Sequence, residues 1–472
     1  MKGAGPAALV ALNREAGDLQ GQLYRTLRAR ILGGGLPAGA RLPSTRQLAV
    51  SLGVARATVV AAYERLLAEG YVVNAAGKAS RVANIVPPVA PALRLAMPPV
   101  RASALMRTPN RLEPGVPDLA SFPAALWGRL LASQARRMAV AQLGYGGAVG
   151  DPALSEAILA HISITRGVVA VPEQVLLFPS TRTALAVIAR VVLQRHASGC
   201  APVWVEDPAY ERARLIFQAA GGHLVPVPVD SAGLDVERAS AFPAPALIYV
   251  TPSHQYPTGV TMSLNRRLQL LEWARQSGAL ILEDDYDSEF QFDGRPIAAL
   301  QGIDQADCVA YLGTFSKVLA PGLRLAYAVL PRPLLAQVRQ AVEREGIAVS
   351  AHIQAAFLVF LRDGHFGAHI KRMTAHYAAR MAAFRSAILH FGDTSIEPGP
   401  GTGGLQLALW FKDHGLDDKA VAASLRLRGY APTPLSTMYE QEGRPGLLCG
   451  IASLPPDQAP EAARAIADLV SC

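Results

Sequence analysis

The spacing of apolar residues predicts a short amphipathic helix near the N-terminal end of the chain. Apolar side chains recur at four-residue steps between positions 17 and 34: Leu19, Leu23, Leu27 and Ile31. Because an α-helix turns once in about 3.6 residues, this spacing places all four on one face. Three glycines from Gly33 onward end the pattern, as is usual at the end of a helix.

Two further helices are predicted after these glycines. Ser44 and Gln47 have the spacing of a capping box, which predicts a helix start with Leu48 and Leu52 turned inward. The next helix is predicted over residues 55–70. Its apolar face is expected to consist of Val59, Tyr63, Leu66 and Leu67.

A β-ribbon and a change of composition follow the three helices. Residues 71–83 predict two short strands around a turn. Three helices followed by such a ribbon are the pattern of a winged helix-turn-helix, which we place at residues 17–83. Residues 84–110 are rich in Pro and Ala without periodicity, so they predict an extended, semi-rigid linker.

Residues 111–472 alternate between strand-like and helix-like patterns. The runs VWVED, ALIYVTP, ALILEDDYD, CVAYLGT and RLAYAVL predict strands. Helices are predicted over 182–195, 208–221, 263–277 and 332–345. This alternation is typical of an α/β domain with a mainly parallel sheet and helices on both faces. From about residue 346 we expect helices and a small mixed subdomain.

Composition limits the class of protein. With 51% hydrophobic and 17% charged residues in a chain of 472, we expect well-packed globular domains and no disordered chain. We find no apolar run long enough to span a membrane and no signal peptide, so the expected location is the cytoplasm. Four scattered cysteines indicate neither a disulfide framework nor a zinc site, and no metal is expected: Cys200, Cys308, Cys449 and Cys472.

Charge is concentrated at one end of the chain. Residues 1–83 hold 11 Lys and Arg against 4 Asp and Glu, so this segment carries +7 of the net charge of +8. Such a local basic excess is the electrostatic footprint of nucleic-acid binding, although charge alone fits a solvated basic surface equally well. Candidate DNA contacts lie at the second and third helix starts and on the ribbon: Arg41, Ser44, Arg46, Arg56, Thr58, Lys78 and Arg81.

The clearest chemical motif is YLGTFSKVLAPGLRLAY at 311–327. Lys317 follows a predicted strand and can form a Schiff base with the aldehyde of pyridoxal 5'-phosphate (PLP). Thr314, Ser316 and Arg324 can hold its phosphate by hydrogen bonds and charge. An isolated lysine is more often a solvated surface charge, so this interpretation depends on further residues.

The run LILEDDYDSEF at 280–290 supplies such residues. A buried carboxylate keeps the pyridine nitrogen of PLP protonated, and Asp284 is our candidate, with Tyr286 near the ring hydroxyl. Asp285, Asp287 and Glu289 are then structural or solvated. The alternative is that all these acids form a surface turn.

These motifs resemble known families. The segment RLPSTRQLAVSLGVARATVVAAYERLLAEGYV resembles the GntR winged-helix family, although Ala55 stands where that family usually has a polar residue. The Lys317 and Asp284 motifs, with EDPAY and YVTPSHQYPTG, resemble fold-type I aminotransferases. Together the two halves resemble the MocR-type (GabR-like) regulators over nearly the entire chain.

The resemblance implies roles for further residues. Lys317 would be the Schiff-base lysine, Asp284 the pyridine partner, Tyr286 a ring-hydroxyl contact and Arg324 a phosphate ligand. Tyr210 would lie by the cofactor or effector, and His254 and Gln255 would line the ring face of the cavity. Tyr256 replaces the Asn of ordinary aminotransferases. Tyr145 would reach the phosphate of the partner subunit in a homodimer.

Two regions depart from the aminotransferase pattern or leave alternatives open. Ser180, Thr181 and Arg182 replace the usual glycine-containing phosphate cup, but a helix N-terminus with two hydroxyls can still bind phosphate. Arg444 precedes a predicted strand, where aminotransferases use an arginine to bind a substrate carboxylate; a surface charge is the alternative.

Three functions follow from these motifs. The first is a transcriptional regulator that binds double-stranded DNA. In this protein an amine or amino-acid effector displaces Lys317 from PLP by forming an external aldimine, and this displacement changes the affinity for DNA. The second is a working aminotransferase with an accessory DNA-binding domain. The third is a DNA-binding protein without PLP, against which the intact lysine motif argues. Residual turnover, the effector, the operator, and activation or repression are left open.

Overall fold

The computed structural model describes residues 12–14, 17–74, 79–84, 110–144, 149–195, 200–292, 298–392 and 394–471. The chain divides into two compact units, Met1–Met106 and Arg107–Cys472. Almost all of the linker predicted at 84–110 lies outside the described residues, so that prediction stays open. In the described part of the chain, no helix is long and apolar enough to cross a membrane.

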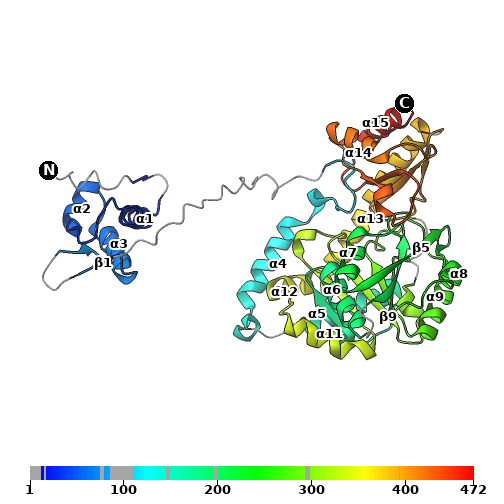
Figure 1. Ribbon diagram of the computed structural model, residues 1–472, viewed down its shortest axis with the longest axis horizontal. Helices are drawn as coiled ribbons and strands as arrows, with labels where there is room; N and C mark the ends of the chain where they lie inside the picture. Colours follow the sequence, from blue (N-terminus) through cyan, green and yellow to red (C-terminus); the bar gives the residue numbers. More distant parts are fainter. Residues whose placement is uncertain are drawn as a thin grey trace. The chain divides into compact units, whose positions relative to one another are not determined.

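The first unit has three helices and a two-stranded ribbon, as predicted (Figure 1). These are α1 (Leu19–Leu32), α2 (Thr45–Leu52), α3 (Arg56–Ala68), β1 (Val72–Val73) and β2 (Arg81–Val82). Both bonds of the capping box predicted at Ser44 and Gln47 are present at the start of α2. The turn of the ribbon lies outside the described residues.

The apolar face of α3 differs from the prediction at one position. Val59, Tyr63 and Leu66 are buried, but Leu67 is 39% exposed. Adjacent helix positions point about 100° apart, so Leu66 and Leu67 cannot both face a narrow core contact. Ala62 occupies the fourth buried position, which restores the spacing of three and four residues.

The second unit is built on an eight-stranded sheet with the order β3-β10-β9-β8-β7-β4-β5-β6. The strands are β3 (Val175–Phe178), β4 (Ala201–Asp207), β5 (Gly222–Asp230), β6 (Gly233–Leu234), β7 (Leu247–Val250), β8 (Leu280–Asp285), β9 (Val309–Thr314) and β10 (Ala326–Val329). The five strands from β9 to β5 are mutually parallel, whereas β10 runs antiparallel to both β9 and β3. The mainly parallel sheet predicted from the alternation is therefore confirmed.

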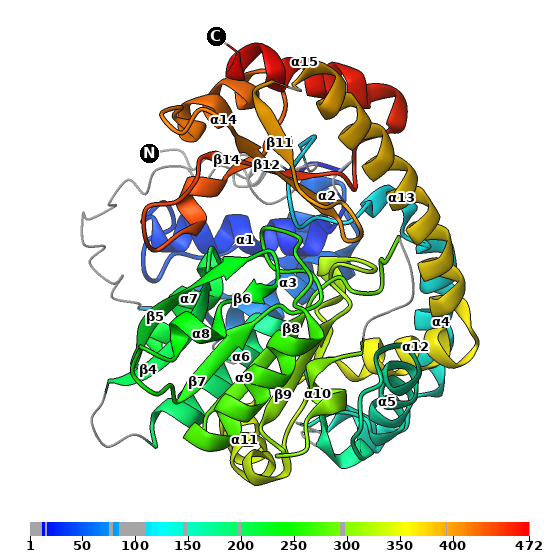
Figure 2. The ribbon, with the colours of Figure 1, turned by 90° about the vertical axis from the view of Figure 1, so that its right-hand side faces the viewer.

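Helices cover both faces of this sheet (Figure 2). One apolar core joins the sheet to α6 (Thr181–Leu193), α7 (Glu211–Ala219) and α11 (Arg332–Arg344). A second core, on the opposite face, joins it to α8 (Val236–Ala239), α9 (Leu264–Ser277) and α10 (Leu300–Ile303). The predicted helices correspond to α6, α7, α9 and α11, with ends shifted by up to three residues.

The end of the chain forms a smaller subdomain. Its antiparallel sheet has the order β11-β12-β14-β13, from β11 (Ile396–Pro398), β12 (Gln406–Phe411), β13 (Thr433–Pro434) and β14 (Gly446–Gly450). Helices α14 (Asp418–Leu427) and α15 (Ala459–Val470) lie together beside it, in orange and red in Figures 1 and 2. The other helices of the unit are α4 (Ala124–Arg137), α5 (Pro152–Arg166), α12 (Ala351–Arg362) and α13 (His365–Phe391).

Candidate functional site

A cavity of about 260 Å³ lies where the carboxyl ends of the parallel strands meet. In open α/β sheets this edge is the usual place for a ligand. Residues that follow β4, β7, β8 and β9 converge there with the N-terminus of α6. The lining consists of Pro114, Gly115, Ser180, Thr181, Arg182, Tyr210, Tyr249, Thr251, Tyr256, Asp284, Tyr286, Asp287, Thr314, Ser316, Lys317, Pro321, Arg324, Leu405 and Gln406.

Lys317 brings an amine into this cavity just beyond the end of β9. Its Nζ donates a hydrogen bond to the Gly115 carbonyl oxygen, 2.5 Å away. Burial lowers the pKa of the lysine from its usual value, although the carboxylates of Asp287 and Asp284 act in the opposite direction. A lowered pKa increases the fraction of neutral amine, which is the nucleophilic form.

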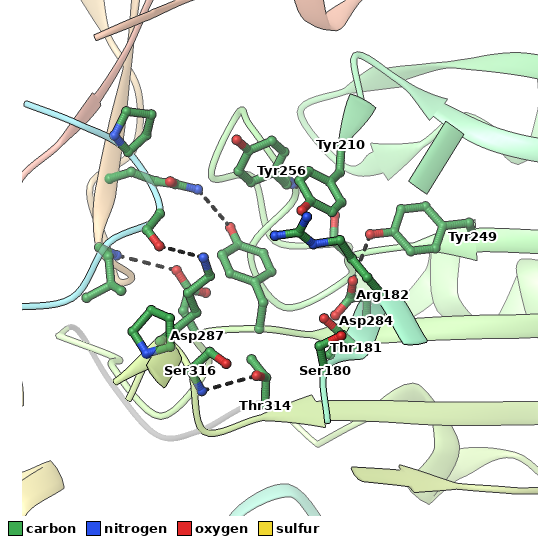
Figure 3. A pocket seen from close by; sticks show the side chains of 18 of the residues that line it. Ser180, Thr181, Arg182, Tyr210, Tyr249, Tyr256, Asp284, Asp287, Thr314 and Ser316 are labelled. Carbon is green, nitrogen blue, oxygen red and sulfur yellow. Dashed lines mark hydrogen bonds between the residues drawn. The ribbon is translucent and has the colours of Figure 1, made fainter. Parts of the chain in front are cut away.

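Asp284 has one satisfied and one unsatisfied oxygen. Its Oδ2 accepts a hydrogen bond of 2.8 Å from the Tyr249 hydroxyl (Figure 3). Its Oδ1 is buried and has no hydrogen-bond partner among the described residues. Burial raises the pKa of Asp284 to about 6, despite the Tyr249 bond and the nearby charge of Lys317. A buried acceptor in this state favours a cationic N–H donor beside it.

Hydroxyl and guanidinium groups gather in another part of the cavity. Ser180 caps α6 by accepting a hydrogen bond of 3.2 Å from the Thr183 amide, and Thr181 begins the helix. Thr314 Oγ1 accepts one of 3.1 Å from the Ser316 amide. A helix N-terminus with hydroxyls and arginines is a site for an anion such as phosphate.

Two arginines also line the cavity. Arg324 has φ +54°, a left-handed conformation that a side chain other than glycine adopts at a cost. Arg182 also lines the cavity, and its side chain lies beside Tyr210 in Figure 3. Arg182 belongs to the segment 180–182, which replaces the usual glycine-containing phosphate cup of aminotransferases.

Three tyrosines form a connected aromatic wall. The ring centroids of Tyr210 and Tyr256 are 5.6 Å apart, and those of Tyr256 and Tyr286 are 5.8 Å apart. The Tyr286 hydroxyl accepts a long hydrogen bond of 3.4 Å from Gln406 Nε2. Gln406 Oε1 is buried without a partner among the described residues, so it adds a second free acceptor to the lining.

His254 and Gln255 lie elsewhere than expected. The two residues are buried but do not line the cavity. His254 Nδ1 is 2.8 Å from Asp287 Oδ1, and its Nε2 is 2.9 Å from Gln291 Nε2. Gln255 Nε2 donates to the Pro208 carbonyl, 2.8 Å away. The loop after β7 thus turns both side chains into the interior, and Asp287 reaches the cavity in place of His254.

Arg444 is also outside the cavity. It precedes β14, which pairs with β12, and β11 lies on the other side of β12. This register brings Arg444 Nη2 to 2.6 Å from Glu397 Oε2 on β11. The expected placement of Arg444 against a ligand carboxylate is therefore not met. Tyr145, predicted to reach a partner's phosphate, lies outside the described residues.

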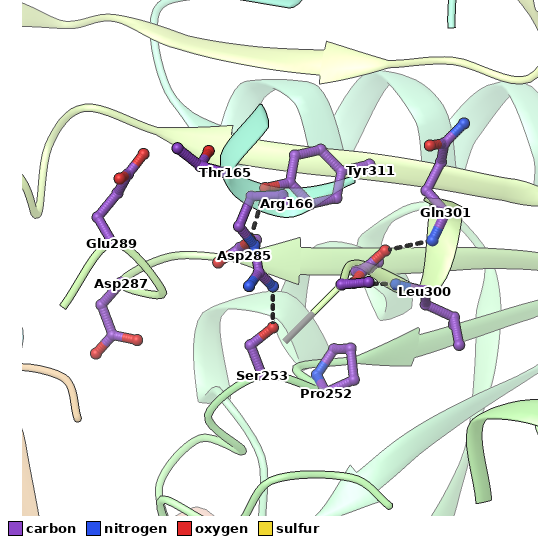
Figure 4. Close-up of polar contacts among 12 residues, drawn as sticks. Thr165, Arg166, Pro252, Ser253, Asp285, Asp287, Glu289, Leu300, Gln301 and Tyr311 are labelled. Atoms are coloured by element: carbon purple, nitrogen blue, oxygen red, sulfur yellow. Dashed lines mark hydrogen bonds and ion pairs between the residues drawn. The ribbon is translucent and has the colours of Figure 1, made fainter. Parts of the chain in front are cut away.

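Two other acids of β8, Glu283 and Asp285, hold neighbouring segments to the end of this strand (Figure 4). Arg166 Nε donates to Asp285 Oδ2 at 2.8 Å, and both side chains are fully buried. Burial opposes ionisation of Asp285, but Arg166 and further hydrogen bonds outweigh it and lower the pKa of the carboxyl. Glu283 accepts from the amides of Leu300 and Gln301 at 2.8 and 2.9 Å.

The candidate DNA contacts lie on the first unit. Arg41, Arg46, Arg56 and Ser44 are exposed, and Arg46 and Arg56 flank a shallow hollow between α2 and α3. Thr58 is half-buried in the first turn of α3, and Ala55 gives this helix no side-chain cap. Arg81 Nη1 donates to the Gly39 carbonyl at 2.8 Å, which ties the ribbon to the unit. Lys78 lies outside the described residues.

Sequence reasoning missed several lining residues. Tyr249 was predicted only as part of a strand, Gln406 had no predicted role, and Asp287 was predicted to be structural or solvated. Gly115 carried no motif. Pairing of β7 with β8 provides a signal for Tyr249, because Tyr249 is opposite Leu282 and so lies near Asp284. Among the described residues, no group of His, Cys, Asp or Glu is arranged to hold a metal ion.

Comparison with known proteins gives the same two-part division. The model for aminotransferase class I and II matches residues 130–466, and the model for bacterial regulatory proteins of the gntR family matches residues 19–82. The probable rhizopine catabolism regulatory protein MocR of Rhizobium meliloti is 36% identical, covering 95% of this chain and 93% of that protein.

Two further similarities extend this comparison. The pyridoxine biosynthesis transcriptional regulator PdxR of Corynebacterium glutamicum is 32% identical, covering 98% of each chain. The crystal structure of LysN, an α-aminoadipate aminotransferase from Thermus thermophilus, has a TM-score of 0.70 and 24% identity, covering 76% of this chain and 92% of that chain. The last similarity concerns the fold alone.

Proposed function

Because the chain belongs to the MocR-type regulators, which join a GntR-type DNA-binding domain to an aminotransferase-like domain, we propose that its large unit binds PLP at Lys317 and senses an amine there. The predicted family and two-part fold are thereby confirmed, and the chain is a DNA-binding regulator. The cofactor, the effector and the role of Lys317 are the proposed part.

The unpartnered Oδ1 of Asp284 is the observation that carries this proposal. A protonated pyridine nitrogen supplies the cationic donor that this buried oxygen lacks. When bound, PLP supplies an aldehyde that reacts reversibly with amines. Lys317 provides an amine in the same cavity, and Ser180, Thr314 and Arg324 provide an anion site suited to the phosphate. The LysN structure contains a phosphopyridoxyl–leucine compound in this fold.

The residues around Lys317 favour an effector that carries an amine. Asp287 and Gln406 both line the cavity, and each offers an acceptor to an ammonium or amine N–H. Tyr210 and Tyr256 enclose the space beside them. An effector that takes the place of Lys317 binds one state of the large unit more tightly than the other. The effector thereby changes the affinity of the protein for DNA by a certain factor. By linkage, bound DNA changes the affinity for the effector by the same factor.

The test uses the visible absorption of the cofactor and DNA binding by the full chain. We expect added PLP to give a visible band that is lost in Lys317→Ala and kept in Lys371→Ala, an exposed lysine on α13. We expect the loaded protein to bind its own promoter region better than random DNA at 150 mM salt, an ionic strength near the physiological value. A band that persists in Lys317→Ala contradicts the cofactor site.

Equal affinity for promoter and random DNA contradicts the regulator function. Steady production of a keto acid at ordinary enzyme rates, about 10 per second, favours the second candidate, a working aminotransferase. The observation that favours this second candidate is that Lys317 and Asp284 both line the cavity. Assembly into a homodimer stays a prediction from the family resemblance.

A further inference from the structure

Residues 110–118, which we call the strap, run from the small antiparallel sheet to the cavity. Near one end, Leu112 forms an isolated β-bridge with Gly450, whose amide donates to the Leu112 carbonyl at 2.9 Å. At the other end, the amide of Asp118 donates to the Tyr377 hydroxyl at 3.0 Å. The strap is thus held to the fold on both sides of Pro114 and Gly115, which line the cavity.

The middle of the strap contacts the lysine directly. The Gly115 carbonyl accepts the 2.5 Å hydrogen bond from Lys317 Nζ. Gly115 has φ +74°, a conformation that favours glycine, and a Cβ at this position would lie 3.2 Å from Nζ. The aim of this carbonyl at the lysine therefore depends on the absence of a side chain.

We propose that Gly115 is a positioning residue through which the strap senses whether Lys317 is free or joined to the cofactor. This inference rests on the proposed function. A lysine nitrogen that is joined to the cofactor as an imine keeps at most one N–H, and in this proposal that N–H no longer donates to Gly115. When an effector amine replaces Lys317 on the cofactor, the released lysine donates to the Gly115 carbonyl again, and this hydrogen bond orders the strap.

The position of the strap in the sequence gives this contact a route to the DNA-binding unit. Residue 110 directly follows the segment 84–109, which leads from the ribbon of the first unit. A hydrogen bond gained or lost at Gly115 changes the stability of the strap, and hence the order of the point where this segment is attached. A typical intramolecular hydrogen bond corresponds to about a fivefold change in an equilibrium constant.

The experiment compares two forms of the cofactor that differ in one group. Full-length protein is loaded with PLP or with pyridoxamine phosphate, which has no aldehyde and leaves Lys317 free. We expect amide hydrogen exchange in peptides covering 110–118 to be about fivefold slower with pyridoxamine phosphate. Borohydride-reduced PLP protein, with Lys317 permanently joined to the cofactor, should exchange as fast as the PLP form.

Two glycine variants separate this contact from general backbone strain. Gly115→Ala should remove the exchange difference between the two forms. Gly364→Ala should keep it, because Gly364 has a matching φ of +77° but no atom within 4 Å of an added Cβ. Equal exchange in the two forms of the wild-type protein, or a difference that survives Gly115→Ala, overturns the inference.

The outcome is distinct from failure of the proposed function. Loss of the cofactor band or of promoter binding in the wild-type protein contradicts the function itself. A protein that has both, and whose strap exchanges alike in the two cofactor forms, contradicts only the role of Gly115. In the Gly115→Ala protein we also expect promoter affinity to lose its dependence on the cofactor form, a change of about fivefold.

Discussion

Replacing Asp284 by Asn should stabilise the cofactor-free protein and weaken its affinity for PLP. The carboxyl is buried, and burial raises its pKa from 3.8 to about 6. A raised pKa of an acid means that the folded state binds its proton more tightly than the unfolded state does. The resulting stability is present below pH 3.8 and is lost as the pH rises through about 6.

The size of the effect follows from these two pKa values. At pH 8 the charged carboxylate costs about 3 kcal/mol of folding free energy, and at pH 5 about half of that. Asn keeps an acceptor for Tyr249 but leaves an amide group without a partner, which costs about 1 kcal/mol. We therefore expect Asp284→Asn to be more stable than wild type by about 2 kcal/mol at pH 8 and by well under half of that gain at pH 5.

The assay is denaturant unfolding of the cofactor-free proteins at both pH values, followed by the same measurement with saturating PLP. PLP should stabilise wild type more than Asp284→Asn, because the variant lacks the carboxylate that the cationic ring pairs with. Asp285→Asn is the matched control on the neighbouring residue. It should be destabilised by about 3–5 kcal/mol, because it removes the negative charge that pairs with the buried guanidinium of Arg166.

The reasoning is refuted by either of two results. One is an Asp284→Asn protein that is no more stable than wild type at pH 8 without cofactor. The other is equal behaviour of the two asparagine variants, because adjacent carboxyls with opposite pKa shifts must respond with opposite signs. A gain at pH 8 that did not shrink at pH 5 would assign the effect to packing and not to charge.

Three further variants test other parts of the structure. Ser44→Ala removes the capping box of α2 and should destabilise the first unit by about 1 kcal/mol, whereas Ser51→Ala, which removes no cap, should not; equal unfolding midpoints contradict this. Arg46→Ala should lower the slope of log affinity against log salt for DNA by about 1, and Arg65→Ala, paired with Glu69, should leave the slope unchanged. Arg444→Ala should change the effector concentration at half-maximal spectral shift by less than about twofold, because Glu397 holds it outside the cavity; a tenfold loss, about 1.4 kcal/mol, would place Arg444 on the effector.

The sequence predicted those parts of the fold that depend on local periodicity and turn chemistry. The capping box at Ser44, the three helices and the strands before Asp284 and Lys317 all follow from short-range patterns. Leu67 was misplaced because a list of apolar residues does not state how wide the buried stripe of a helix is. The antiparallel direction of β10 also carried no local signal, since it depends on the path of the chain between the strands.

The part of the candidate site that was predictable consists of residues whose chemical role follows from their own short sequence motif. Lys317, Asp284 and Arg324 lie in the cavity because a strand-end lysine, a buried acid and a nearby cation are arranged by consecutive strands. His254 and Arg444 were misplaced because each has a partner of opposite charge far along the chain, Asp287 and Glu397. Long-range pairs of this kind leave no trace in the spacing of the sequence.

The acidic run after Leu282 explains how one short segment serves both the site and the fold. Successive residues of a strand point to opposite faces of the sheet, so Glu283 and Asp285 share one face and Asp284 points to the other. On the first face, backbone amides bind Glu283 and Arg166 binds Asp285. On the second, Asp284 accepts a hydrogen bond only from Tyr249 among the described residues, and its Oδ1 has no hydrogen-bond partner. Alternation along β8 therefore separates the acids that stabilise the strand ends from the one acid that is left free for a ligand.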